Sequence, residues 1–297
     1  MEFANPFAAP GKWYKGNLHT HTTVSDGSSS PEETVRLYHE AGYDFLALTD
    51  HFQVATAENP WPREMLLLLG IEFDGDQSDL GESYHILGFG LKEAGQPPNE
   101  ITVSSAIDWI KQQGGEAVFA HPYWSGLIAA DLLKWEGALG LEVYNATCFA
   151  LNGKGCAAAQ WDDVLARGRR MWGFAVDDCH GRTGDTDVTT AWVMVKSPAL
   201  TREAILTSLR EGLFYSSYGP AIEDVTIADG VVTAKTSPVV EINFIAPSWQ
   251  GGHALSEPGK TMTGARYKLR GGERYLRVEC RDAQGRWAWA NPIYLEP

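Results

Sequence analysis

The chain has few cysteines and few basic residues, and each shortage excludes a class of protein. Its four cysteines show no CxxC spacing, so neither a disulfide framework nor a cysteine-based zinc site is expected. Its 24 lysines and arginines stand against 38 acidic residues, and the net charge of −14 disfavours binding to nucleic acid. No apolar run is long enough to cross a bilayer, and the N-terminal segment lacks the basic and apolar regions of a signal peptide. We therefore expect a cytoplasmic globular protein that binds neither nucleic acid nor a membrane.

The negative charge is unevenly distributed, and this indicates two domains. From Pro220 to Pro297 the chain has nine acidic and nine basic residues, so the whole excess lies in residues 1–219. Past Gly219 and Pro220 the pattern also changes to short alternating apolar runs separated by glycine or proline, at 231–234, 239–244, 275–278 and 287–294. Such runs are typical of a small antiparallel β-sandwich. We expect a first domain over 1–219 and a β-sandwich domain over 220–297.

The first domain alternates short apolar strands with helical segments. Ser30, Pro31 and Glu33 give an N-cap, a first-turn proline and a capping box, and Gly42 follows the helix that they begin. Strands are predicted at 17–21, 45–49, 66–73, 84–89, 116–120, 141–144 and 171–176, and further helices near 157–167 and 201–210. Strands alternating with helices indicate the α/β class and βα units.

Histidines and carboxylates lie at or near the ends of these strands. The nine residues are His19, His21, Asp26, His51, Glu72, His85, His121, Asp178 and His180. A (β/α) barrel places its active site at the C-terminal ends of its strands. Nine such groups buried around one point need cations to compensate them, so the pattern predicts a multinuclear metallohydrolase.

Each motif alone also has a simpler interpretation. His19 and His21 stand at i and i+2 of a strand and share one face, but two polar residues can end a strand by chance. Asp26 could be a turn former and His85 a hydrogen-bonded core histidine. Glu72 lies in the apolar run 66–73, where a carboxylate bridging two cations would escape the cost of burial. The recurrence at several strand ends favours the metal site.

Two neighbouring features match a metal site only superficially. Asp74, Asp76 and Asp79 suggest a calcium loop, but the glycine and glutamate of the EF-hand spacing are missing, so we expect a polar loop near the site. Cys179 lies between Asp178 and His180, and alternation along an extended strand would point its thiol away from them.

The combined motifs resemble those of the PHP (polymerase and histidinol phosphatase) phosphoesterases. They are LHTH followed by SDG, then LTDH, GIE, YHILG, AHP and DDCH. The resemblance covers about residues 13–219, and the segments WYKGNLHTHTTVSDG and GLFYSSYGP look closest to the branch of carbaryl-hydrolase-like metallohydrolases. It implies a distorted barrel of about seven βα units that holds up to three divalent metals.

The resemblance also implies a ligand set. His19, His21, Glu72 and Asp178 would surround one cation, Glu72 would bridge to a second held by His85 and His121, and Asp26, His51 and His180 would take the third. Mixed imidazole and carboxylate ligands suit two or three ions of Zn, Mn or Fe. Two such cations would lower the pKa of a bridging water and polarise the substrate oxygen, with Glu72 and Asp178 at the reacting centre.

Other residues are candidates for proton transfer or substrate binding. Asp50 and Asp177 could donate the leaving-group proton, or orient ligands instead. The candidates for binding substrate follow strand ends or lie near them. They are Arg182, Lys154, Tyr123, Trp124, Glu142 and Asn145. Arg182 and Lys154 could instead be solvated surface residues. Tyr123 and Trp124 could instead pack in the core.

Three functions remain open for a small-molecule substrate or partner. The metal set favours a phosphoesterase that acts on a small organic phosphate. The scarcity of basic residues near the motifs weakens that hypothesis. An aromatic mouth and the closer subfamily resemblance favour a hydrolase of carboxylic or carbamic esters instead. A non-catalytic binder could use Trp287 and Trp289, which share one strand face as a sugar platform would, although a sandwich core explains them as well.

Overall fold

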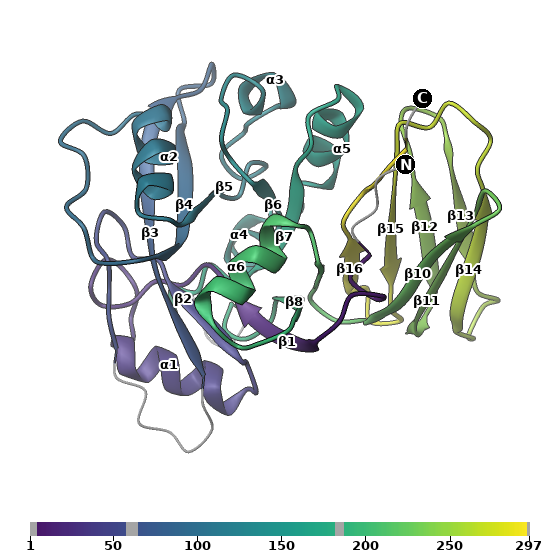
Figure 1. The fold of residues 1–297 in the computed structure, drawn as a ribbon, viewed down its shortest axis with the longest axis horizontal. Coiled ribbons are helices and arrows are strands. Elements are labelled where there is room, and N and C mark those ends of the chain that lie inside the picture. Colours follow the sequence, from purple (N-terminus) through teal and green to yellow (C-terminus); the bar gives the residue numbers. More distant parts are fainter. Residues whose placement is uncertain (1–4, 58–64, 182–186, 296–297) are drawn as a thin grey trace.

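The computed structural model describes residues 5–57, 65–181 and 187–295 and consists mainly of one large mixed sheet. Fourteen strands form this sheet, and three more form a small separate sheet. Figure 1 shows the helices gathered around one half of the molecule and an all-β part at the other. The chain is therefore α/β, as the sequence predicts.

The elements up to Pro220 alternate as follows. The strands are β1 (Lys12–Asn17), β2 (Phe45–Leu48), β3 (Leu66–Gln77), β4 (Ser83–Leu91), β5 (Glu116–Phe119), β6 (Gly140–Asn145), β7 (Trp172–Val176), β8 (Trp192–Ser197) and β9 (Phe214–Ser217). The helices are α1 (Pro31–Glu40), α2 (Val103–Gln112), α3 (Ala129–Leu132), α4 (Ala146–Asn152), α5 (Ala158–Ala166) and α6 (Arg202–Arg210). None of the helices in the described ranges is both long and apolar enough to span a bilayer.

Strand direction places the predicted ligands at one edge of the sheet. Strands β1, β2 and β3 are parallel, as are β5, β6 and β7, and β4 is antiparallel to both of its neighbours. Six strands therefore run in one direction. Because β4 is reversed, its N-terminal end, which carries His85, lies at the edge where those six strands end. The reversal follows from the short 78–82 connection, which cannot contain a crossover helix.

The closed barrel of about seven βα units is not confirmed. The path of paired strands ends at β7, and in the described ranges no ladder joins β7 to β1 or β8. The segments beyond β1 and β7 nevertheless meet, because the Asp178 amide donates to the His19 carbonyl (3.0 Å) and the His21 amide to the Cys179 carbonyl (2.9 Å). The sheet thus curves far enough to bring its two ends together around the site.

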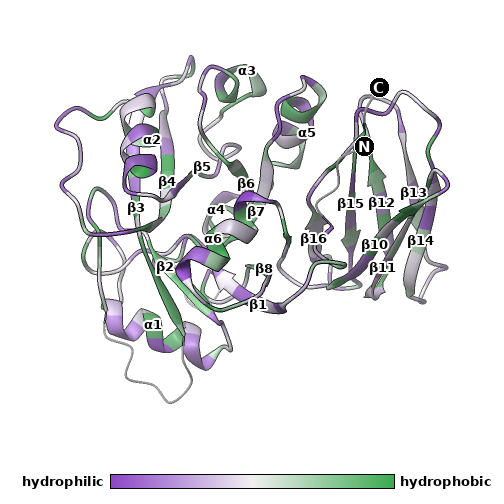
Figure 2. Cartoon of the chain, viewed as in Figure 1, coloured by the Kyte–Doolittle hydropathy of each residue, from purple (hydrophilic) through white to green (hydrophobic). Residues whose placement is uncertain are grey.

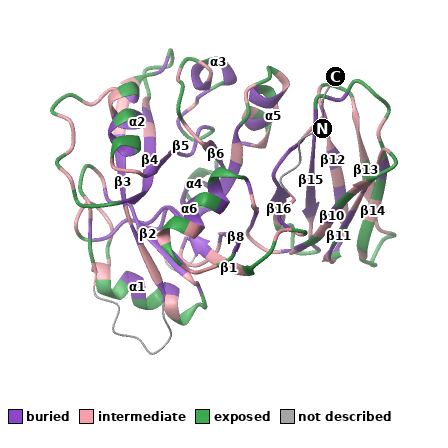
Figure 3. Ribbon diagram, in the orientation of Figure 1, coloured by how far each residue is buried: buried purple, intermediate pink, exposed green. Residues whose placement is uncertain are grey.

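Local sequence signals explain where several elements begin. The Ser30 hydroxyl accepts from the Glu33 amide and the Glu33 carboxylate accepts from the Ser30 amide, which confirms the predicted capping box of α1. Helix α1 shows both hydrophobic and hydrophilic residues in Figure 2, and its buried residues are Thr34, Val35 and Tyr38. In Figure 3 the strands of the large sheet are mostly buried, whereas exposed residues lie on the helices and loops.

Beyond Pro220 all strand pairs are antiparallel. The strands are β10 (Ile222–Ala228), β11 (Val231–Val239), β12 (Glu241–Ile245), β13 (Gly251–Leu255), β14 (Met262–Lys268), β15 (Tyr275–Arg281), β16 (Trp287–Ala290) and β17 (Ile293–Tyr294). Strands β10, β11 and β14 form the small sheet, and β16 pairs with β9, so the large sheet continues into this part. Val232, Ile242 and Val278 belong to the apolar cluster that includes residues of both sheets.

An aromatic cluster connects the two parts of the molecule. The rings of Tyr144 and Tyr218 stack with centroids 4.0 Å apart, and Trp289 lies about 6 Å from each. Trp289 is only 2% exposed. The suggested sugar platform of Trp287 and Trp289 is therefore wrong, because Trp289 packs in the core.

Candidate metal centre

The nine predicted ligands converge at the common edge of the strands. Their donor atoms form three overlapping groups within which all atoms lie less than 4.8 Å apart. The groups are His19, His21, Glu72 and Asp178; His51, Glu72 and His85; and His21, Asp26, His51 and His180. His121 adds its Nε2 atom 3.3 Å from Glu72 Oε1. The first group contains the four ligands that the resemblance implies for one cation. His51 belongs to both of the other groups.

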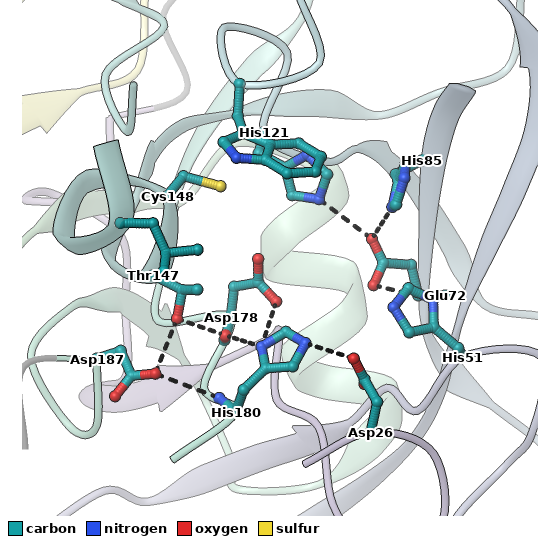
Figure 4. A pocket seen from close by; sticks show the side chains of 12 residues that line it. Asp26, His51, Glu72, His85, His121, Thr147, Cys148, Asp178, His180 and Asp187 are labelled. Carbon is teal, nitrogen blue, oxygen red and sulfur yellow. Dashed lines mark hydrogen bonds and ion pairs between the residues drawn. The ribbon is translucent and has the colours of Figure 1, made fainter. Parts of the chain in front are cut away.

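Glu72 belongs to two of the three groups and contacts five of the imidazoles. It is 1% exposed, and its Oε2 atom lies 3.0 Å from the Nε2 atoms of both His19 and His21 and 3.6 Å from His51 Nδ1. Its Oε1 atom lies 3.0 Å from His85 Nδ1 and 3.3 Å from His121 Nε2. Figure 4 shows His51, His85 and His121 around this carboxylate. One carboxylate therefore faces five imidazoles, with a different set at each oxygen.

Asp178 and His180 approach from the segment after β7. Asp178 Oδ1 lies 3.2 Å from His19 Nε2 and 3.1 Å from His21 Nε2, and His180 Nε2 lies 3.3 Å from Asp26 Oδ2 (Figure 4). Asp178 has a φ of +55° and His121 a φ of +24°, conformations that side-chain-bearing residues rarely adopt. Backbone strain of this kind concentrates at functional sites.

Buried atoms without hydrogen-bond partners show that the donor set fits a cation. In the described ranges these atoms include His51 Nδ1, Asp74 Oδ1 and Asp178 Oδ1, all of which belong to this cluster. A buried polar atom without a partner is costly, and a divalent cation would satisfy several such donors at once. Imidazole nitrogens and carboxylate oxygens are suitable ligands for Zn, Mn and Fe.

The imidazoles and carboxylates shift each other's pKa values. Burial alone would lower the pKa of His19, but Asp178, Glu72 and Glu142 outweigh it and raise this pKa well above its ordinary value. The same opposition raises the pKa of His21 to about 9. Burial would raise the pKa of Glu72, but His19 and its other imidazole neighbours hold it well below its usual range. Without a cation, protons on His19 and His21 would compensate the carboxylates that face them.

Glu142 and Asn145 orient ligands rather than line the mouth of the site. Both are buried, and Glu142 accepts from His19 Nδ1 (2.6 Å), from the strained His121 amide (2.7 Å) and from Asn145 Nδ2 (2.9 Å). Asn145 Nδ2 also donates to Asp178 Oδ2 (3.0 Å). Neither residue lines the cavity, so the prediction that they contact substrate is wrong. Instead, a carboxylate that accepts from His19 Nδ1–H leaves the Nε2 lone pair of His19 facing the centre.

Asp50 and Asp177 are also directed away from the reacting centre. Asp50 accepts from the amides and hydroxyls of Thr22 and Ser25, and so holds the loop that carries Asp26. Asp177 accepts from Tyr38 Oη (2.7 Å) and from the segment at 190–191, and burial raises its pKa to about 6. Neither carboxylate lines the cavity, so their predicted role as proton donors gives way to a positioning role.

A cavity of about 250 Å³ opens beside the centre. It is lined by Asp26, His51, Glu72, His85, His121, Trp124, Thr147, Cys148, Leu151, Asp178, His180 and Asp187. Trp124 takes its predicted place, with its ring centroid 5.2 Å from that of His121. Tyr123 lines a different cavity, beside Cys156, and Lys154 lies exposed on a loop. Arg182 lies outside the described residues.

Several residues near the centre were not among the sequence candidates. Asp74 Oδ1 lies close to His51 and His85, and Thr147 Oγ1 donates to the Asp178 carbonyl (2.7 Å). Asp187 accepts from the His180 amide (3.4 Å). The two-residue strand period that connects Glu72 with Asp74 could have identified Asp74, but nothing in the sequence marks Asp187. Cys179, as predicted, points away and packs in an apolar cluster with Tyr38 and Leu48.

No family model matches the chain, but the chain is similar to known proteins over part or nearly all of its length. The chain is 31% identical over 96 residues to phosphoribosyl 1,2-cyclic phosphate 1,2-diphosphodiesterase of Eggerthella lenta, covering 31% of this chain and 36% of that protein. It is 36% identical over 73 residues to the DNA polymerase/3'-5' exonuclease PolX of Bacillus subtilis, covering 25% of this chain and 13% of that protein. The chain thus spans well under half the length of either relative.

A solved structure extends the similarity to nearly the whole chain. It is a two-domain protein from Bacteroides vulgatus that contains a predicted PHP-like metal-dependent phosphoesterase. It has 17% sequence identity, a TM-score of 0.53, and coverage of 96% of this chain and 95% of that protein. The two proteins therefore share a fold.

Proposed function

We propose that this protein is a metal-dependent phosphoesterase that hydrolyses a small organic phosphate. The observation that carries the proposal is the position of Glu72, whose two oxygens each face a separate set of histidines. The motif match assigns His19, His21, Glu72 and Asp178 to one cation, Glu72, His85 and His121 to a second, and Asp26, His51 and His180 to a third. The described similarity to a cyclic phosphodiesterase supports phosphorus chemistry.

The chain's own residues would position ligands and shape the cavity. When bound, two or three divalent ions would supply Lewis-acid polarisation of the substrate and acidify a water molecule. Glu142 holds His19 and the His121 backbone, and Asn145 ties Glu142 to Asp178. Such fixed orientation reduces the reorganisation that the reaction requires. We assign this role to the unit of residues 1–219 and treat 220–297 as an accompanying β domain.

The cavity also favours a second candidate, hydrolysis of carboxylic or carbamic esters, the chemistry of the branch that the motifs resemble. No lysine or arginine is found among the described residues that line the cavity. Trp124 and Leu151 are 37% and 59% exposed there and offer an apolar wall. An uncharged ester with an aromatic group would fit such a wall, whereas a phosphate would depend on the cations for its binding.

A turnover screen distinguishes the two candidates. The Mn- or Zn-loaded protein is tested on aryl phosphates, phosphodiesters, nucleotides, aryl esters and carbamates, with a chelator-treated sample as control. We expect metal-dependent kcat/KM to be highest for a phosphate. Turnover of esters alone would select the second candidate, and no metal-dependent turnover of any of them would contradict both.

Adjacent aromatic residues give a matched test of the cavity wall. Trp124→Ala is expected to raise KM for aryl substrates by about 10-fold, the effect of losing an apolar contact of 1–2 kcal/mol. Tyr123→Ala should leave KM unchanged, because Tyr123 is similarly exposed but lines another cavity. Equal effects of both replacements would exclude a specific role for Trp124.

A further inference from the structure

Asp74 lies on the same face of β3 as Glu72, two residues farther along the strand. In the antiparallel pair of β3 and β4, Asp74 stands directly opposite His85. Since side chains two residues apart on a strand share a face, the carboxylate of Asp74 is directed to the same side as that of Glu72. Strand β3 continues to Gln77, with a shift of register between Asp74 and Gln77, so Asp74 belongs to the strand and not to the polar loop that the sequence suggested.

The carboxylate of Asp74 approaches two imidazoles of the centre. Its Oδ1 atom lies 3.5 Å from His51 Nδ1 and 3.4 Å from His85 Nδ1. Those same two nitrogens also face Glu72, at 3.6 and 3.0 Å. Each of these two imidazole nitrogens therefore lies near both carboxylates, His51 facing Glu72 Oε2 and His85 facing Glu72 Oε1.

The contacts of Asp74 differ from those of an ordinary ion pair. Charge-assisted hydrogen bonds between nitrogen and a carboxylate are about 2.7–2.9 Å long. Asp74 Oδ1 and His51 Nδ1 are instead both buried and without a hydrogen-bond partner in the described part of the chain. Atoms in that situation carry an uncompensated desolvation cost, which a cation placed between them would remove. The Asp74 side chain as a whole is 39% exposed, so its position is not imposed by burial alone.

We infer that Asp74 is an additional ligand of the cation beside His51, His85 and Glu72, a residue that the PHP motifs do not include. The inference rests on the proposed metal centre. A second carboxylate at this position makes the donor set richer in oxygen, which favours Mn²⁺ or Fe²⁺ relative to a site dominated by imidazole. It also adds a negative charge that would strengthen the retention of a divalent cation there.

The test compares metal binding by three chains. Wild type, Asp74→Asn and the control Asp79→Asn are stripped with a chelator and titrated with Mn²⁺ or Co²⁺. Asp79 follows in the same acidic stretch, but its side chain is 86% exposed and lies 3.3 Å from Lys134. We expect Asp74→Asn to bind one cation at least about 10-fold more weakly than wild type and to alter the visible absorption of the Co²⁺-loaded protein. Asp79→Asn should match wild type in both measurements.

Each outcome supports or overturns the inference. Unchanged affinity, stoichiometry and Co²⁺ absorption in Asp74→Asn would overturn the ligand role while leaving the proposed metal centre intact. A wild-type chain that binds no Mn²⁺ or Co²⁺ would instead overturn the proposed function together with the inference. Thermal unfolding of the metal-free variants shows whether they are folded, and Asp74→Ser replaces Asp74→Asn in all measurements if the latter is not.

Discussion

Two buried clusters of charged side chains in this protein are built in different ways. Where α5 meets the strands beyond Pro220, Arg277 is 2% exposed and donates to Asp162 and Glu279. Its guanidinium also lies over the ring of Trp161, 4.9 Å from the ring centroid. Tyr275 donates a further hydrogen bond to Asp162 (2.9 Å). Charges of opposite sign are thus paired within this cluster.

In the metal centre the pairing depends on protons. Its carboxylates face imidazoles, which compensate them only when protonated, and His51 Nδ1, Asp74 Oδ1 and Asp178 Oδ1 have no hydrogen-bond partner in the described ranges. A cluster whose charges are paired within the protein needs no ligand, whereas buried atoms without a partner are satisfied by binding one. The difference identifies which buried charges are structural and which are functional.

Removing the shared carboxylate of the centre should have the largest effect. Glu72→Gln keeps the size of the side chain but loses the charge that faces five imidazoles. We expect hydrolysis to fall by at least about 10⁴-fold and bound metal to decrease, because the effect of a metal ion on the barrier is several kcal/mol. Steady-state kinetics and elemental analysis measure both. Full turnover with unchanged metal content would contradict the bridging role of Glu72.

Breaking the paired cluster should reduce stability without affecting metal content. Arg277→Met leaves Asp162 and Glu279 without their cation, and we expect a loss of about 3–5 kcal/mol in the free energy of unfolding. Denaturant titration measures this loss. Arg167→Met is the control, because the pair of Arg167 with Asp163 is exposed and should contribute less than about 1 kcal/mol. If the two replacements destabilise equally, the contrast between the clusters is wrong.

The effect of pH on the stability of the metal centre should depend on whether metal is bound. In the metal-free protein the pKa of His21 is raised to about 9, above its ordinary 6.5, so its stabilising proton is fully bound below pH 6.5 and lost as pH rises through 9. We expect the metal-free protein to lose on the order of 1–3 kcal/mol between these values. The metal-loaded protein should lose much less, because its imidazoles are already deprotonated. Thermal unfolding of both forms from pH 6 to 9 measures the difference, and parallel pH profiles would contradict it.

A smaller effect is expected from loosening the support of the ligands. Glu142→Gln removes the charge that accepts from His19 and from the His121 amide. Loss of such a partner lowers metal affinity by about 10–100-fold. Metal titration measures the change, with Glu136→Gln as the control because that carboxylate is 83% exposed and pairs with Arg169. Equal affinity in both variants would show that the orientation of His19 does not depend on Glu142.

Much of the fold was predictable from local patterns. The capping box at Ser30 and Glu33 begins α1 as expected, and most predicted strands of the first part agree with the structure within a few residues. The reversed strand β4 was not anticipated, although the short connection at 78–82 excludes a helix there. Whether the sheet closes could not be predicted, because closure depends on the curvature summed over many strand pairs.

The candidate site was predictable only in part. The strand predicted at 17–21 is wrong in its position, because β1 ends at Asn17 and His19 and His21 follow it. Their i, i+2 spacing nevertheless brings both Nε2 atoms to Glu72, 3.0 Å away. Four residues next to the motifs in sequence do not face the cavity and form hydrogen bonds elsewhere. They are Asp50, Asp177, Glu142 and Asn145. Adjacency along the chain does not determine the direction of a side chain beyond its own strand.

The sequence alone determined the identity and order of the donor groups, because strand alternation and helix caps act over a few neighbouring residues. Only the tertiary structure decided that Asp74 joins His51 and His85 and that Glu142 supports both His19 and His121. Those contacts join residues from different strands, and their geometry follows from how the whole sheet curves around the site.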